Sequence, residues 1–178
     1  MIDPASSLTS GYHVFFEPSG DANEQLASVI HELSAEYGGP LFQPHVTLLA
    51  MIPETDETIL VEKARKLAGR LASFELALVA LSAEDKYFRS LYLKVHPSEE
   101  LLRSRALALE MFALEEVSEY MPHLSLLYGN YDSERKQQSI ALLEGLLPLS
   151  FRAGSVTLWK TPGEASTWKK VGEYPLSV

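Results

Sequence analysis

The sequence predicts an α+β protein with two pseudosymmetric lobes, each an antiparallel sheet with helices packed on its outside, and a cleft between the lobes. Strand-like and helix-like apolar patterns alternate along the whole chain. The order strand, helix, strand beginning with Pro-His, helix occurs twice, which indicates a duplicated lobe. No linker, low-complexity segment or charge run divides the chain, so residues 1–178 are expected to form one bilobal domain.

The first half of the chain opens with an apolar strand pattern at 11–18. A helix at 22–39 follows, because its apolar residues recur on one helical face and Gly38-Gly39-Pro40 stops it. Asp21 or Asn23 is the expected N-cap of this helix. The remaining elements follow the same criteria. They are a buried strand at 45–52 that ends before Pro53, a helix at 56–71, and an antiparallel pair at 74–84 and 86–95 with a tight turn near Asp85.

The second half repeats the order of the first. A helix is expected at 98–114, a second strand beginning with Pro-His at 122–129, and a helix at 132–146. A last pair of strands, at 149–160 and 167–176, closes the chain.

The composition excludes several classes of protein. The chain contains no cysteine, so disulfides, thiolate metal sites and a cysteine nucleophile are ruled out, and a reducing compartment, cytoplasmic or nuclear, is expected. A net charge of −9 disfavours long nucleic acid as a partner, since the surface would repel a phosphate backbone. The start of the chain shows no signal-peptide pattern and no apolar run is long enough to span a membrane, so no membrane association is expected. No obligate protein partner is evident.

Two similar hexapeptides, Pro44–Leu49 and Pro122–Leu127, carry the chemistry. A string this specific arises by chance on the order of once in a million starting positions, yet it occurs twice here. On a strand, residues i and i+2 share a face, so each motif presents an imidazole beside a hydroxyl. The pairs are His45 with Thr47 and His123 with Ser125.

Two imidazoles and two hydroxyls on one cleft suit phosphoryl chemistry. One imidazole takes a proton from an attacking water and the other gives one to the departing oxygen, because histidine titrates nearest neutral pH. The hydroxyls of Thr47 and Ser125 are expected to bind the non-bridging phosphate oxygens. The near-symmetry of the motifs leaves open which histidine is the base and which is the acid.

Other types of site fit the sequence less well. The motifs lack the second metal ligand that histidine zinc sites commonly show, so no metal and no cofactor are expected. Ser125 lacks the strand-to-helix turn of a nucleophile elbow, and no glycine-rich phosphate loop is present. Three other histidines have no comparable neighbours and are expected to be structural or surface residues: His13, His31 and His96.

The sequence resembles the 2H phosphoesterases, a family defined by two His-x-Thr/Ser motifs in two pseudosymmetric lobes. The similarity is strongest to the cyclic phosphodiesterase branch of plants and fungi. It covers nearly the whole chain through the segments GGPLFQPHVTLL, YFRSLYL and YMPHLSLLYG, and through the tail that contains Trp168. The resemblance implies hydrolysis of small cyclic phosphates: ADP-ribose 1″,2″-cyclic phosphate, a by-product of tRNA splicing, and nucleoside 2′,3′-cyclic phosphates, which would yield 2′-phosphates.

The resemblance also implies substrate-binding aromatic residues at Tyr128 and Phe88, and Trp168 is a further stacking candidate. Tyr128 lies at an odd offset from His123, so it faces the cleft only if the strand ends or bulges before it. Arg89 and Lys86 are candidates for attracting phosphate, although a solvated hairpin edge explains them equally well.

Two other functions remain open at this point. One is an RNA-end-processing enzyme of the same type, ligase-like or trimming oligonucleotides, and the acidic charge argues against it. The other is a non-catalytic nucleotide-binding module, and the presence of both imidazoles argues against that.

Overall fold

The computed structural model describes residues 8–177 and contains four α-helices and eight strands among them. The strands are β1 (Tyr12–Phe16), β2 (Val46–Ile52), β3 (Phe74–Ala83), β4 (Leu91–Val95), β5 (His123–Leu127), β6 (Leu149–Ala153), β7 (Ser155–Lys160) and β8 (Lys169–Pro175). The α-helices are α1 (Gly20–Tyr37), α2 (Glu57–Ala68), α3 (Glu99–Phe112) and α4 (Ser133–Leu143), and short 3-10 helices span Tyr87–Arg89, Glu144–Leu146 and Ala165–Thr167.

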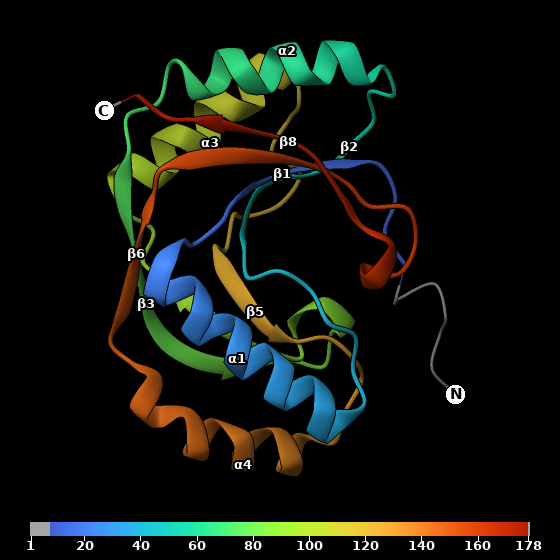
Figure 1. Ribbon diagram of the computed structural model, residues 1–178, viewed down its shortest axis with the longest axis vertical. Coiled ribbons are helices and arrows are strands. Elements are labelled where there is room, and N and C mark those ends of the chain that lie inside the picture. Colours follow the sequence, from blue (N-terminus) through green and yellow to red (C-terminus); the bar gives the residue numbers. More distant parts are fainter. Residues whose placement is uncertain (1–7, 178) are drawn as a thin grey trace.

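All eight strands form one curled antiparallel sheet in the order β6-β3-β4-β5-β2-β1-β7-β8 (Figure 1). The predicted α+β class is confirmed, and the two expected lobes are the two four-stranded halves of this sheet. The halves meet between β5 and β2, where a single residue pair, Val46 and Leu124, is in register. The strands that carry the two motifs are therefore the innermost strands of the molecule.

The helices lock the two halves together. α2 and α3 cover the half formed by β2, β1, β7 and β8, whereas α1 and α4 cover the other half (Figure 1). α1 follows β1 in the chain but packs on β5, and α3 follows β4 but packs on β2. Because each of these helices crosses to the opposite half, the shared apolar core holds the two motif strands at a fixed separation.

The boundaries of most predicted helices and strands agree with the structure to within a few residues, and three expectations were wrong. The N-cap position of α1 is Ser19 rather than Asp21 or Asn23, and its side chain makes no capping hydrogen bond. The expected strand 86–95 begins only at Leu91, because Tyr87–Arg89 forms a turn of 3-10 helix. The expected strand 149–160 is interrupted at Gly154, and its two parts pair with β3 and β1 at distant positions in the sheet. No helix within residues 8–177 is long and apolar enough to cross a membrane.

Candidate active site

The pairing of β2 with β5 sets the relative position of the two motifs. Val46 pairs with Leu124, and both side chains are fully buried in the core. Their sequence neighbours therefore point to the opposite face of the sheet. The residues that flank this pair are His45 and Thr47 in one motif and His123 and Ser125 in the other, so both imidazoles and both hydroxyls share that face.

These four side chains line one hollow, here called the central cavity, with a volume of about 390 Å³. It lies on the sheet face that is not packed against the helices, and many of its lining residues are aromatic or apolar. The cavity is lined by Leu8, Thr9, Ser10, His13, Phe15, His45, Thr47, Ala50, Met51, Phe88, Arg89, His123, Ser125, Tyr128 and Trp168. The structure thus brings both predicted motifs and all three predicted aromatic residues to one place.

Both motif histidines are held by the backbone two residues before them. Nδ1 of His45 lies 2.6 Å from the carbonyl oxygen of Gln43, and Nδ1 of His123 lies 2.9 Å from that of Met121. A carbonyl oxygen only accepts, so in each ring Nδ1 carries the proton that it donates. In the neutral form Nε2 is then a free acceptor, and in the charged form it is a donor. Both rings are therefore ready to exchange a proton through Nε2.

Burial makes the charged form of both rings costly. It is the main reason why the pKa of His45 is lowered to about 4, against the opposing effects of the Gln43 hydrogen bond and the Glu17 carboxylate. Burial also lowers the pKa of His123, and the Arg89 guanidinium adds to this effect, against the opposing effects of the Met121 hydrogen bond and the Glu84 carboxylate. A carboxylate therefore favours the protonated form of each ring, and a guanidinium acts against it at His123.

A polar cluster fixes the charges beside His123. Glu84 accepts hydrogen bonds from Arg89 at 2.8 Å and from the hydroxyl of Tyr92 at 2.9 Å, and Lys86 lies 3.1 Å away. The Tyr92 ring meets the His123 ring edge-on, with centroids 5.5 Å apart. Among the described residues that line the central cavity, Arg89 is the one with a formal charge at neutral pH, whereas Lys86 does not line it.

The two hydroxyl-bearing residues differ in their partners. Ser125 is buried, and its hydroxyl donates to the carbonyl oxygen of Phe88 at 2.7 Å. Thr47 is half-buried, and its backbone carbonyl accepts a hydrogen bond from Tyr120 at 2.9 Å. Ser125 therefore also ties the 3-10 turn Tyr87–Arg89 to β5, which brings Phe88 to the cavity wall.

Tyr128 reaches the cavity because β5 ends at Leu127, so the strand alternation that would turn it away no longer applies. Its ring is buried and stacks on Phe42 with centroids 3.7 Å apart. Phe88 meets Tyr128 edge-on at 5.1 Å, and Trp168 lies 6.1 Å from Tyr128. Phe42, Phe88 and Trp168 are half-buried, and of these Phe88 and Trp168 line the central cavity and can offer a ring face to a ligand.

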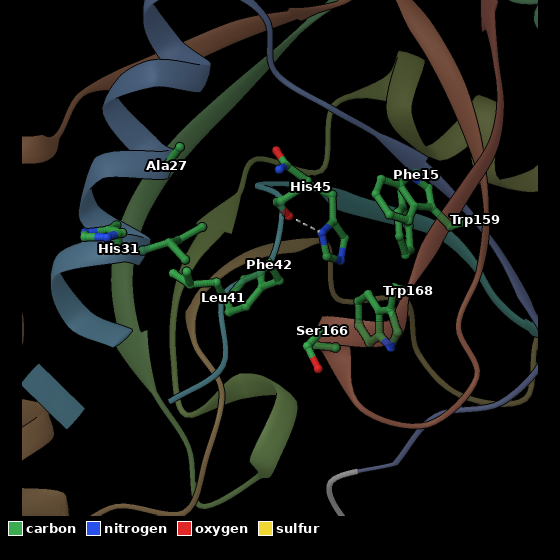
Figure 2. A pocket seen from close by; sticks show the side chains of 12 residues that line it. Phe15, Ala27, His31, Leu41, Phe42, His45, Trp159, Ser166 and Trp168 are labelled. Atoms are coloured by element: carbon green, nitrogen blue, oxygen red, sulfur yellow. Dashed lines mark hydrogen bonds between the residues drawn. The ribbon is translucent and has the colours of Figure 1, made fainter. Parts of the chain in front are cut away.

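A second hollow of about 350 Å³, here called the side pocket, also has His45 in its wall (Figure 2). Figure 2 shows Ala27 and His31 on α1, Phe42 in the segment leading to β2, and Trp168 opposite them. Phe15, His45 and Trp168 line both hollows, so the two hollows adjoin each other at these three side chains. The lining residues of the side pocket carry no Lys, Arg, Asp or Glu.

Sequence reasoning missed three residues of this site. His13 was expected to be structural, yet it lines the central cavity. Phe15 stacks on His45 with ring centroids 4.0 Å apart, and Phe42 meets His45 at 6.4 Å. The period-two pattern of β1 places His13 and Phe15 on one face, but only the pairing of Phe15 with Thr47 reveals that this is the cleft face. His31 lines the side pocket, and His96 is exposed outside both hollows.

Comparison with known proteins agrees with this geometry. The family model described as cyclic phosphodiesterase-like protein matches residues 11–174. The chain belongs to this family. It is therefore an enzyme of the phosphoric diester hydrolase class, and the predicted 2H phosphoesterase resemblance is confirmed.

Two curated relatives fit the same family. The chain is 26% identical over 171 residues to a cyclic phosphodiesterase of Arabidopsis thaliana, covering 90% of this chain and 92% of the relative. It is 28% identical over 184 residues to a 2′,3′-cyclic-nucleotide 3′-phosphodiesterase of Phaeosphaeria nodorum, covering 86% of this chain and 92% of the relative.

Solved structures share the fold of this family member at low sequence identity. Escherichia coli LigT complexed with 3′-AMP superposes with a TM-score of 0.61 at 14% identity, covering 96% of this chain and 99% of LigT. The TT0787 protein of Thermus thermophilus superposes with a TM-score of 0.63 at 16% identity, covering 93% of this chain and 97% of that protein. Both cover more than nine-tenths of this chain, so the overall fold is shared.

Proposed function

We propose that this chain hydrolyses small cyclic phosphates without a metal ion, using His45 and His123 as general acid and base. The proposed substrates are nucleoside 2′,3′-cyclic phosphates, opened to 2′-phosphates, and ADP-ribose 1″,2″-cyclic phosphate, opened to the 1″-phosphate. The observation that carries the proposal is the Val46–Leu124 register, which places both imidazoles and both hydroxyls on the wall of one cavity. The names of the two curated relatives support the substrate class.

The reaction needs one neutral and one protonated imidazole at the same time. A water molecule attacks phosphorus and gives its proton to Nε2 of the neutral ring. The bond from phosphorus to O3′ breaks, and Nε2 of the protonated ring gives its proton to O3′. The product is a 2′-phosphate monoester, and the two rings have exchanged protonation states. Solvent restores them before the next turnover.

We assign His45 as the acid and His123 as the base. Each ring has a carboxylate that supports its positive charge, Glu17 for His45 and Glu84 for His123, and the Arg89 guanidinium opposes that charge at His123. An anionic phosphate bound between the rings offsets part of the burial cost that disfavours the charged form of His45 in the free enzyme. This assignment requires O3′ to lie on the His45 side and the attacking water on the His123 side.

Thr47 and Ser125 are proposed to bind the non-bridging phosphate oxygens, where negative charge grows in the transition state. Phe88, Tyr128 and Trp168 form the aromatic walls against which a base would pack, a contact worth about 1–3 kcal/mol per stacked base. The side pocket adjoins the central cavity at His45, and it is proposed to take the rest of a substrate larger than a mononucleotide.

The ligand is proposed to be a small molecule rather than long nucleic acid, and no membrane or obligate protein partner is part of the proposal. The net charge of −9 supports this, because each further phosphate of a long chain would approach an acidic surface. A reducing compartment, cytoplasm or nucleus, is proposed from the absence of cysteine.

The direct test is an assay in excess EDTA with adenosine 2′,3′-cyclic phosphate, ADP-ribose 1″,2″-cyclic phosphate and an oligonucleotide ending in a 2′,3′-cyclic phosphate. The two small substrates are expected to be hydrolysed, with adenosine 2′-phosphate as the product of the first, and to show a higher kcat/KM than the oligonucleotide. Loss of all activity in EDTA that added metal restores would overturn metal independence. A higher kcat/KM for the oligonucleotide at low salt would favour RNA-end processing instead.

A further inference from the structure

His13 is a buried histidine of the central cavity that the mechanism above does not use. It precedes Phe15 by two residues on β1, so both side chains lie on the cleft face. The His13 ring lies 5.7 Å from the Phe15 ring and is nearly parallel to Trp168 at 6.4 Å. It is 6% exposed. A polar ring is therefore enclosed by aromatic side chains next to His45.

One nitrogen of this ring has no partner. Within residues 8–177, three buried side-chain polar atoms lack a hydrogen bond: Nε2 of His13, the hydroxyl of Ser90 and the hydroxyl of Thr161. Of these three residues, only His13 lines the central cavity. Buried polar groups are nearly always paired, and an unpaired one costs folding free energy. An unpaired atom at a substrate cavity therefore points to a partner that arrives with the substrate.

The protonation of the ring decides what kind of partner it takes. Burial, aided by the charge of His45, lowers the pKa of His13 to about 4, so the ring is neutral near pH 7. The backbone of Ser10 favours the charged form of the ring, as a carbonyl acceptor beside a ring nitrogen does. Nε2 has no partner, so the proton of the neutral ring is assigned to Nδ1, toward Ser10, which leaves Nε2 as an acceptor. An acceptor does not bind a phosphate oxygen, which is itself an acceptor.

We propose that Nε2 of His13 accepts a hydrogen bond from a neutral donor on the nucleoside part of the substrate and so contributes to substrate specificity. This inference rests on the proposed function. In a nucleoside 2′,3′-cyclic phosphate both vicinal hydroxyls are esterified, so the donors left are the 5′-hydroxyl and the N–H groups of the base. These two sources share one chemistry, and two substrate analogues separate them.

The first part of the test compares His13→Phe with the wild-type enzyme. The variant keeps an aromatic ring between Phe15 and Trp168 but removes the acceptor. We expect KM for adenosine 2′,3′-cyclic phosphate to rise roughly tenfold with little change in kcat, because one neutral hydrogen bond is lost. The melting temperature should stay level or rise, because an unpaired polar atom is replaced by an apolar one. His13→Gln, which returns an acceptor, should recover most of the KM, and His96→Phe serves as the exposed control.

The second part uses the 5′-deoxy and N6,N6-dimethyl analogues of the same substrate. With the wild-type enzyme, the analogue that lacks the donor bound by His13 should lose roughly tenfold in kcat/KM, and with His13→Phe it should lose nothing. Equal kcat/KM of the wild-type enzyme on the parent and both analogues would overturn the inference even if the variant failed to fold. So would a fall in kcat at unchanged KM, which would assign His13 to the attacking water. No hydrolysis of any of the three by the wild-type enzyme would overturn the proposed function itself.

Discussion

Ser125→Ala tests whether a motif hydroxyl acts on the substrate or only on the fold. In the structure this hydroxyl already donates to the carbonyl oxygen of Phe88 at 2.7 Å. To bind a phosphate oxygen it must turn away from that carbonyl, which costs about 0.5–1.5 kcal/mol, or roughly 2- to 13-fold in rate. A donor aimed at developing charge is worth about 10²–10³-fold in kcat. The net loss expected for Ser125→Ala is therefore about 10- to 500-fold in kcat.

The assay is steady-state hydrolysis of adenosine 2′,3′-cyclic phosphate, with thermal unfolding measured on the same samples. Ser125→Ala should also lose about 0.5–1.5 kcal/mol of stability, because the Phe88 carbonyl loses its donor. Ser139→Ala is the matched control: Ser139 is buried, lies 2.7 Å from the Tyr37 hydroxyl and is outside both hollows, so it should lose stability but no kcat. A kcat of Ser125→Ala within twofold of wild type, together with lower stability, would refute the catalytic reasoning.

Three further predictions concern the two imidazoles and the side pocket. Burial lowers the pKa of both His45 and His123, so the protonated imidazole loses its proton at a lower pH than a free histidine would. A plot of kcat/KM against pH should therefore be bell-shaped, with its descending limb below pH 6.5. A steady rise of kcat/KM to pH 9 would contradict this. A 2′,3′-cyclic phosphate with sulfur in place of O3′ needs little acid catalysis, because a thiolate leaves without being protonated. His45→Ala should therefore hydrolyse this analogue much faster than the normal substrate, and His123→Ala should gain little. The reverse pattern would exchange the roles of the two histidines. Ala27→Trp, which fills the side pocket, should lower kcat/KM for ADP-ribose 1″,2″-cyclic phosphate about tenfold or more and leave kcat/KM for adenosine 2′,3′-cyclic phosphate unchanged. Ala35 is exposed on the same helix, so Ala35→Trp should change kcat/KM for neither substrate. Equal effects of Ala27→Trp on both substrates would refute the proposed role of this pocket.

The sequence was enough to predict the α+β class and the meeting of the two motifs, because both depend on local patterns. Alternation along a strand determines which side chains share a face, and a repeated hexapeptide in a chain with duplicated order predicts one shared cleft. The orientation of Tyr128 was not fixed by the sequence, because the expected strand 122–129 would have turned its ring away, and the ring reaches the cavity because β5 ends at Leu127.

The parts that were missed depend on contacts between distant segments. His13 belongs to the site because β1 lies between β2 and β7. The order of strands in the sheet cannot be predicted from the sequence of any single strand. The expected strand 149–160 has a continuous apolar pattern, yet Gly154 separates two strands that pair near opposite ends of the sheet. The 3-10 turn Tyr87–Arg89 is likewise held by a distant group, the Ser125 hydroxyl, so strand propensity alone misplaced it.

The most direct test of the two-histidine mechanism is the turnover of His45→Ala, His123→Ala and the double variant on adenosine 2′,3′-cyclic phosphate in excess EDTA. Each single variant should lose about 10²–10⁴-fold in kcat, as expected for a general acid or base. Residues that act as a unit are not additive, so the double variant should be little slower than the slower single variant. A kcat of either single variant within threefold of wild type would contradict the account, because catalysis would then not require both histidines.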